Sequence, residues 1–299
     1  MRTAPLKWIA LLAGCLSLWF TACVAAPDPY LVISHAPGGE TIEAATPCQP
    51  GLLNGHADDK DRRSNALDPE GFSLMVWNML KGNRQGWEKD FYTLGREADV
   101  ILLQEAHLTD EMRRALQTIE MDWCLAATLK INGNEAGVMT ASEGAPQVIC
   151  MQQSIEPLLK VPKVKLFTRF PLSIDGRQLV VVNVHAINFT VGTDHFRRSW
   201  QTLEAALAPY KGPLIVAGDF NTWNLERLTI VEKTAERLGM QPVRFTPDRR
   251  SLIFDQPVDH VYYRGLVPLD ASVVDVATSD HNPMRITFKL GGHPIGEQR

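Results

Sequence analysis

The chain has 299 residues, of which 45% are hydrophobic and 21% charged, and its net charge at neutral pH is −4. Its length allows one large domain or two small ones, and its slightly acidic balance gives no support to broad electrostatic adhesion to nucleic acid. A nuclease whose metal ions bridge to the phosphate is still compatible with this charge.

Residues 1–26 are expected to be an export signal or a membrane anchor. Arg2 and Lys7 begin the segment, and a run of apolar residues follows them, as in a signal peptide. Small residues precede Cys15 and Cys23, so either cysteine could receive the lipid of a bacterial lipoprotein. The alternatives are an uncleaved helix that spans a bilayer and a buried helix of the domain. We therefore expect an exported, periplasmic or membrane-anchored protein.

Residues 27–70 are rich in proline, glycine, aspartate and asparagine and show no sustained periodicity, which predicts an irregular tether. No linker, repeat or low-complexity block interrupts residues 71–290, which favours a single domain followed by a tail over residues 291–299. Three cysteines lie beyond the N-terminal segment: Cys48, Cys124 and Cys150. Their spacing matches no zinc site, and either two of them form a disulfide or all three are free buried thiols.

The first predicted strands each end in a polar residue. Residues 72–77 run into Asn78, which either starts a turn or offers an amide oxygen to Mg²⁺. After a helix predicted over residues 81–96, residues 99–105 repeat the design, with four apolar residues that run into a glutamine and Glu105. A carboxylate at the end of a buried strand is seldom there for stability, so we interpret Glu105 as a metal ligand rather than a surface acid.

A helix is predicted next over residues 110–121, and strands over residues 137–142 and 165–170. Lys163, just before the second of these strands, is expected to be solvated rather than in contact with a phosphate. A long β-branched strand over residues 177–185 then ends in a histidine.

That histidine, His185, is followed closely by Asn188. A lone histidine is usually a satisfied core or surface group, but here it stands at the end of a buried strand. His185 and Asn188 together suit a pair of donors to a phosphate oxygen. Asn188 also begins a glycosylation acceptor sequence, an interpretation that the bacterial type of signal weakens.

A helix over residues 195–207 is predicted before the apolar strand 214–217, which runs into Gly218-Asp219-Phe220-Asn221. The alternation of side chains along a strand would place Asp219 and Asn221 on the same side. Both are costly to bury unless something pairs with them, so they could hold a metal-bound phosphate or water. An Asx turn after the strand is an equal alternative.

The last part of the chain predicts a helix over residues 225–238 and strands over residues 257–263, 271–276 and 284–288. Asp259 lies near the start of the first of these strands, and Asp280 and His281 precede the last. Histidine is a proton acceptor near neutral pH, and a carboxylate elsewhere in the chain could orient its other ring nitrogen, as in catalytic triads.

Four short motifs occur in an order that resembles the endonuclease/exonuclease/phosphatase superfamily, over roughly residues 72–290. They are Trp77-Asn78, Leu103-Gln104-Glu105, Gly218-Asp219-Phe220-Asn221 and Ser279-Asp280-His281. Each motif is short, but the ordered set is specific, and it looks most like that of the bacterial YafD group. The resemblance implies an α/β fold, a four-layer α/β/β/α sandwich of two packed mixed β-sheets flanked by helices.

The resemblance also implies a role for each motif residue. Asn78, Glu105 and Asp280 would hold a divalent metal. Asp219 would align or deprotonate the attacking water, and Asn221 would hold the phosphate. These ligands are oxygen donors without a thiolate, which suits Mg²⁺ or Mn²⁺ better than Zn²⁺.

By the same resemblance His185 would donate to the non-bridging oxygens, and His281, oriented by Asp259, would act as a base or stabilise the transition state. Two positions depart from the family pattern. Leu80 stands where abasic endonucleases carry an acid, which puts metal binding at that corner in doubt. His260 stands where the family often has an aromatic or apolar residue, and it is either a further site group or a strand-edge histidine.

These residues predict a divalent-metal-dependent phosphoester hydrolase, in which the metal and a histidine assist the attack of water. The expected substrate is a nucleic acid or another phosphodiester, or alternatively a phospholipid or a sugar phosphate. A membrane anchor would favour a lipid, and the absence of a basic stretch removes one support for DNA. An inactive descendant that only binds phosphorylated ligands would not need Asp219 and His281. No feature of the sequence predicts a protein partner.

Overall fold

The computed structural model describes residues 24–25, 31–36, 38–54, 66–173 and 176–291. The expected export signal, apart from its last residues, and the expected C-terminal tail, apart from its first residue, therefore lie outside the described residues. Among the helices of these ranges, none is both long and apolar enough to cross a bilayer.

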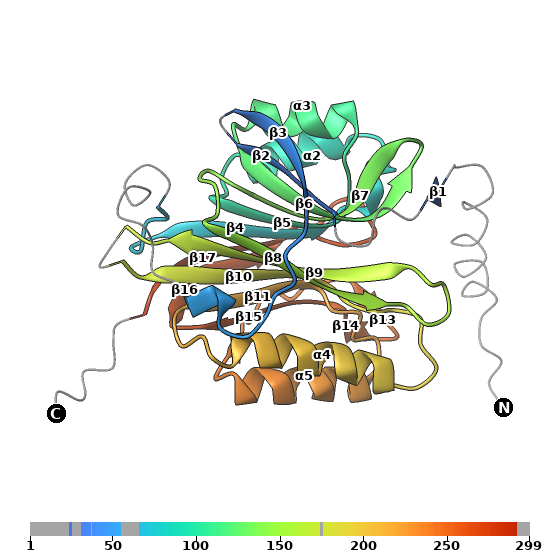
Figure 1. Cartoon of the computed structure of the whole chain (residues 1–299), viewed down its shortest axis with the longest axis vertical. Coiled ribbons are helices and arrows are strands. Elements are labelled where there is room, and N and C mark those ends of the chain that lie inside the picture. The colour runs from blue at the N-terminus through green and yellow to red at the C-terminus, as the bar shows by residue number, and fades with distance from the viewer. Residues whose placement is uncertain (1–23, 26–30, 37, 55–65, 174–175, 292–299) are drawn as a thin grey trace.

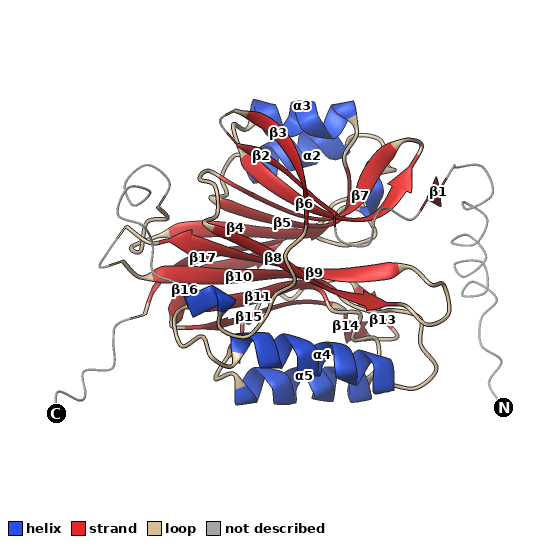
Figure 2. Ribbon diagram, in the orientation of Figure 1, coloured by secondary structure: helices blue, strands red, loops and turns tan. Residues whose placement is uncertain are grey.

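Two mixed β-sheets pack face to face, and each carries a pair of helices on its outer face (Figures 1 and 2). The first sheet has the strand order β16 (Leu266–Val273), β17 (Met284–Leu290), β4 (Phe72–Asn78), β5 (Val100–His107), β7 (Asn134–Ser142), β6 (Asp122–Ile131), β2 (Leu31–Ala36), β3 (Gly39–Ala44), with β1 (Val24–Ala25) beside β6. The second has the order β12 (Gln241–Pro242), β15 (Asp259–Arg264), β11 (Leu214–Asp219), β10 (Gln178–His185), β9 (Pro162–Pro171), β8 (Val148–Ile155).

The helices α2 (Trp87–Gly95) and α3 (Asp110–Thr118) cover the first sheet, and α4 (Asp194–Leu207) and α5 (Leu225–Arg237) cover the second (Figure 1). A separate hairpin consists of β13 (Leu252–Ile253) and β14 (Gln256–Pro257), and short 3-10 turns lie at η2 (Leu52–Asn54) and η3 (Leu80–Gly82). The expected α/β/β/α sandwich is confirmed.

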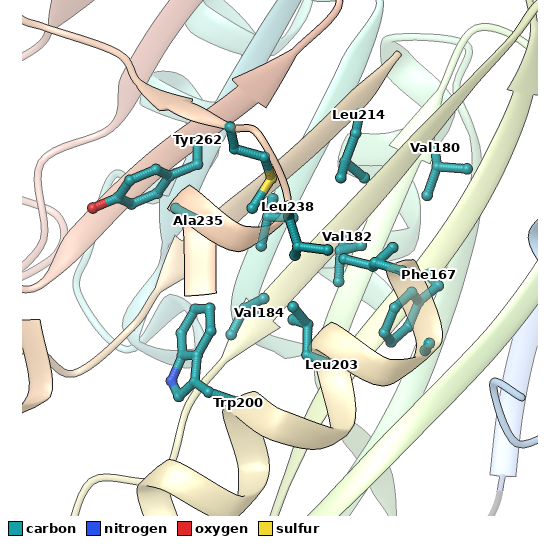
Figure 3. Close-up of a cluster of buried hydrophobic side chains, with 14 of the residues drawn as sticks. Phe167, Val180, Val182, Val184, Trp200, Leu203, Leu214, Ala235, Leu238 and Tyr262 are labelled. Carbon is teal, nitrogen blue, oxygen red and sulfur yellow. The ribbon is translucent and has the colours of Figure 1, made fainter. Parts of the chain in front are cut away.

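Strand β10 shows why the central strands read as continuous apolar runs. Val182 and Val184 face α4, where they contact Trp200 and Leu203 (Figure 3). Val181 faces the opposite way, into the core between the two sheets. Because both faces of the strand are buried, apolar residues occupy successive positions rather than alternate ones.

The predicted elements agree with the structure in type but differ at some ends. The helix predicted over residues 81–96 begins only at Trp87, because Gly82 and Gly86 have left-handed backbones, with φ of 66° and 92°. The helix predicted over residues 110–121 ends at Thr118. The strand predicted over residues 271–276 is β16, which begins earlier and ends at Val273.

The irregular tether expected over residues 27–70 is wrong for two segments. Strands β2 and β3 extend the first sheet as its edge, where β2 pairs with β6. Neither β6 nor β8 was predicted from the sequence. Every residue of β3 is exposed, so no apolar period marks it, and its pairing partner rather than its own side chains makes it a strand.

A disulfide joins Cys48 to Cys150 on β8, with the two Cα atoms 5.0 Å apart. The segment before β4 is thereby tied to the second sheet as well as to the first. Cys124 is free and buried in β6. Of the two alternatives that the sequence leaves open for the cysteines, the disulfide is the one that the structure contains.

Candidate active site

Three of the expected site residues lie side by side across the second sheet. Strands β10 and β11 are parallel, so their last residues, His185 and Asp219, are paired neighbours. Strand β15 is antiparallel to β11, so its first residue, Asp259, lies beside Asp219 from the other side. Segments distant in sequence therefore present their polar ends at one edge of the sheet.

The first sheet brings Asn78 and Glu105 to the same place. Strands β4 and β5 are parallel and pair Asn78 with the residue before Glu105. The side-chain amide of Asn78 donates a hydrogen bond of 3.1 Å to Oδ2 of Asp219, which joins the ends of the two sheets. Gly218 lets β11 lie close to β10 and to the first sheet, because a Cβ there would lie 2.1 Å from the carbonyl oxygen of Val184 and 3.0 Å from Nε2 of Gln104.

The carboxylate of Asp219 is held on both oxygens. The backbone amide of Asn221 donates to Oδ1 at 3.0 Å, so the Asx turn and the site geometry are both present. Nε2 of His185 lies 3.6 Å from Oδ2. Burial raises the pKa of Asp219 to about 6, although the charge of His281 acts against this rise. A carboxylate of this kind is a stronger proton acceptor than a solvated one.

His281 and Asp259 form a buried pair. Nδ1 of His281 lies 2.8 Å from Oδ2 of Asp259, and the indole of Trp77 donates to the backbone carbonyl of His281 at 3.0 Å. Burial disfavours the imidazolium, but the Asp259 carboxylate outweighs it and raises the pKa of His281 to about 10. The ring is therefore a cation near neutral pH, which favours the stabilising role over that of a base.

Two lysines reach into the site. Nζ of Lys81 contacts Oε2 of Glu105, and Nζ of Lys163 donates to Nε2 of His185 at 2.7 Å. The expectation that Lys163 is merely solvated is therefore wrong. Lys81 escapes notice in the sequence because it lies in a turn, where a lysine is ordinarily exposed. Both Lys81 and Glu105 have left-handed backbones, with φ of 61° and 51°, a strained conformation that recurs at functional sites.

These lysines also set the charge state of their partners. Burial would raise the pKa of Glu105, but the charges of Lys81, His185 and Lys163 lower it well below its usual range. Burial and the charge of Lys163 lower the pKa of His185. A neutral His185 accepts a hydrogen bond from the amine of Lys163 at Nε2, which leaves two further N–H groups of Lys163 for an incoming phosphate.

The remaining expected residues lie close by but have other contacts. The side-chain amide of Asn221 donates to the carbonyl of Ala186 at 3.1 Å, and Oδ1 of Asn188 accepts from the indole of Trp223 at 3.0 Å. Asp280 is exposed beside His281, and the hydroxyl of Ser279 donates to it at 3.4 Å.

His260 is a core residue rather than a further site group. It is buried, stacks on Phe220 with ring centroids 5.4 Å apart, and its Nε2 lies 2.6 Å from the hydroxyl of Thr222. Burial lowers the pKa of His260 to about 3, so the ring is neutral. It points to the opposite face of β15 from Asp259, as neighbours in a strand do.

The donors at the site fit a hard cation in type. Glu105 and Asp219 are carboxylates, and Asn78 adds an amide oxygen. Among the residues that the structure describes, no three histidine, cysteine, aspartate or glutamate side chains are arranged to hold a metal ion. Lys81 contacts Oε2 of Glu105, so its amine would compete with Mg²⁺ or Mn²⁺ for that oxygen.

Sequence reasoning missed Arg227, which organises the loops behind the site. Its guanidinium is fully buried and donates to the carbonyl oxygens of Ile187, Asn188 and Asn221 at 2.7 to 3.0 Å. It therefore connects the segment after β10 with the segment after β11. An arginine inside a helix gives no signal of such a role, because most helical arginines lie at the surface.

A model of the endonuclease/exonuclease/phosphatase family matches residues 75–281. The UPF0294 protein of Vibrio cholerae El Tor is 38% identical over 230 residues, which are 76% of this chain and 82% of that protein. The UPF0294 protein of Yersinia pestis is 38% identical over 216 residues, which are 72% and 83% of the two chains.

Solved structures share the fold at low sequence identity. The human Nocturnin catalytic domain with bound sulfate is similar with a TM-score of 0.55 and 19% identity, over 75% of this chain and 96% of that one. ANGEL2, a 2′,3′-cyclic phosphatase, is similar with a TM-score of 0.54 and 15% identity, over 74% and 96%. The match of the family model over most of the chain, together with these folds, shows that the chain belongs to the endonuclease/exonuclease/phosphatase family.

Proposed function

We propose that the chain is a divalent-metal-dependent phosphoester hydrolase that acts on phosphodiesters. The observation that carries this proposal is the convergence of Asp219, Glu105 and the His281–Asp259 pair at one edge of two sheets. A module that only binds phosphate has no use for a buried carboxylate held on both oxygens beside an oriented imidazolium. The inactive alternative is therefore disfavoured.

In the proposed reaction Asp219 orients a water molecule and accepts its proton as the water oxygen bonds to phosphorus. The phosphorus–oxygen bond to the leaving group breaks, and the leaving oxygen departs with the bonding electrons. Asn221 hydrogen-bonds a non-bridging oxygen. Because Asp259 fixes its Nδ1, the cationic ring of His281 presents Nε2 to the charge that grows on the phosphate.

The metal would be held by Glu105 and Asn78, with Asp280 as a further oxygen donor. When bound, Mg²⁺ or Mn²⁺ supplies electrostatic stabilisation of the phosphate oxygens. With a metal at Glu105, Lys81 would release that carboxylate, and its amine, with that of Lys163, would be available to the phosphate. Two amines and one imidazolium would stabilise the negative charge of the phosphate, but they do not replace the metal-binding acid that is missing at Leu80.

The similarity of the motifs to the YafD group, export of the chain, and its attachment to a membrane through residues 1–26 are parts of the same proposal. An exported hydrolase meets phospholipids, and the net charge of −4 does not attract it to nucleic acid. The fold alone does not choose the substrate.

The test is hydrolysis of bis(4-nitrophenyl) phosphate by the purified full chain, with and without Mg²⁺. Asp219→Ala and His281→Ala should each lower the metal-dependent rate on the order of 10²-fold or more. Asp270→Ala, an exposed acid on β16, is the matched control and should keep the full rate. Unchanged metal-dependent rates in both site variants would refute the proposed mechanism.

A further inference from the structure

Large apolar side chains are exposed at the tips of four loops. Leu158 lies between β8 and β9, Val191 between β10 and α4, Leu225 at the start of α5, and Phe254 in the β13–β14 hairpin. Their exposed fractions are 59%, 86%, 67% and 62%. Single exposed apolar residues are ordinary, but a set gathered on adjoining loops marks an interaction surface. We call this set the apolar collar.

Contacts join the loops that carry the collar. Glu156, in the β8–β9 connection, accepts the backbone amides of Asn188 and Phe189 at 2.7 and 2.8 Å. The indole of Trp223 donates to Asn188, and the ring of Trp223 lies 6.2 Å from that of Phe254. Each loop of the collar therefore touches the next one.

Two contacts join the collar loops to the polar site. Lys163 follows the β8–β9 connection and contacts His185. The hydroxyl of Ser251, at the base of the hairpin, accepts the backbone amide of Asn282, the residue after His281. A phosphate site with exposed apolar side chains on the neighbouring loops fits a molecule whose phosphate head is joined to apolar chains.

We propose that the apolar collar docks on a phospholipid bilayer and that the phosphoester is that of a lipid head group. The second part rests on the proposed function, whereas the docking does not. The collar residues would enter the boundary between head groups and acyl chains, while the strand ends behind them receive the phosphate.

The N-terminal part of the chain favours a bilayer over a protein partner. The apolar run that begins after Lys7 leads to β1, which pairs with the end of β6 at Lys130 and Ile131. Figure 1 shows β1, β13 and β14 at the same end of the molecule. An anchor formed by this run would hold the collar against the membrane that carries it. The exposed Lys160, beside Leu158, adds a charge that suits anionic head groups.

The first test measures hydrogen–deuterium exchange of the full chain with vesicles of phosphatidylcholine and phosphatidylglycerol in a 3:1 ratio. We expect exchange over residues 155–160, 189–193 and 252–256 to slow at least threefold when vesicles are added. A collar variant, Leu158→Ser with Phe254→Ser, should lose this protection, because each side chain contributes apolar area at the interface.

A control variant carries Val267→Ser and Leu269→Ser, two exposed residues on β16. Strand β15 begins at the site with Asp259 and ends at Arg264, so β16, which begins at Leu266, starts at the end of the molecule opposite the site. Val267 and Leu269 therefore lie far from the collar. This control should keep the protection. Equal protection in the collar variant would overturn the docking, as would protection that appears without vesicles as the protein concentration rises, since that would indicate a second copy.

The second test separates docking from chemistry. The collar variant should hydrolyse bis(4-nitrophenyl) phosphate at the wild-type rate but release phosphorylated head group from the vesicles on the order of tenfold more slowly. If the wild type did not hydrolyse bis(4-nitrophenyl) phosphate, the proposed function would be refuted, while the exchange result would still test the docking. No release from vesicles by an active, docked wild type would refute the lipid substrate.

Discussion

Replacement of Arg227 by methionine should both destabilise the fold and slow hydrolysis. The guanidinium donates to the carbonyls of Ile187, Asn188 and Asn221 and to Oγ1 of Thr190, at distances of 2.7 to 3.0 Å. All four acceptors belong to the two loops that carry the phosphate-facing residues. Methionine fills a similar apolar volume but donates to none of them.

The magnitude follows from these contacts. Each acceptor left without its donor costs about 1 kcal/mol or more. The guanidinium carbon also lies 4.7 Å from the ring centroid of Phe196 and 4.4 Å from that of Trp223, and such contacts contribute about 1 kcal/mol each. The sum over four acceptors and two ring contacts is a loss of about 6 kcal/mol in the free energy of unfolding.

Urea denaturation at pH 7.5 measures this loss, and initial rates on bis(4-nitrophenyl) phosphate at a temperature where the variant is folded measure the effect on the site. We expect kcat to fall on the order of tenfold with little change in KM, because a displaced loop misaligns Asn221. Arg227→Lys keeps the charge but loses the planar guanidinium, so its free energy of unfolding and its kcat should lie between those of the wild type and Arg227→Met.

The matched control is Arg237→Met, on the same helix. Arg237 is half exposed and pairs with Glu204 at the surface, so its loss should cost less than about 1 kcal/mol. If Arg227→Met proved no more destabilising than Arg237→Met, or if its folded form kept the full rate, the loops would not depend on this side chain.

Three further predictions concern stability and the metal. Burial lowers the pKa of Lys165 from 10.5 to about 7, so the unfolded chain binds the proton more tightly. The free energy of unfolding of the wild type relative to that of Lys165→Met should therefore rise by about 2 kcal/mol from pH 7 to pH 9, a comparison in which the opposite pH dependence of His281 cancels. Denaturant titrations of both proteins at both pH values measure this difference in the free energy of unfolding. A difference that is the same at pH 7 and pH 9 would contradict the prediction. Cys48→Ser should lower the free energy of unfolding by about 2 to 4 kcal/mol, since the bond closes a separation of 102 residues. Reduced wild type should match the variant, and a wild type indifferent to dithiothreitol would disprove the effect. Glu105→Gln should weaken Mn²⁺ binding in calorimetry on the order of tenfold, whereas Glu135→Gln, on β7, should leave it unchanged. Equal Mn²⁺ affinities in these two variants would show that Glu105 is not a ligand of the metal.

The sequence predicts the central strands well because each is a short apolar run bounded by polar residues. It also predicts where chemistry lies, since a buried strand that ends in Glu105 or Asp219 has no stability reason to do so. It fails for the edge of the first sheet. Strand β3 is exposed along its whole length, and only the backbone groups offered by β2 make it a strand.

Local pattern therefore determined the individual central strands and helices, the order of the polar strand ends and the type of ligand they offer, whereas the sandwich fold was implied by the family resemblance. Tertiary structure alone decided which of these ends meet, through the register that sets Asp219 between His185 and Asp259. It also decided that Lys163 contacts His185 and that the loops that carry the apolar collar touch one another. The physical reason is that register and loop contact depend on backbone pairing and packing between segments far apart in sequence, which leave no periodic trace in any one of them.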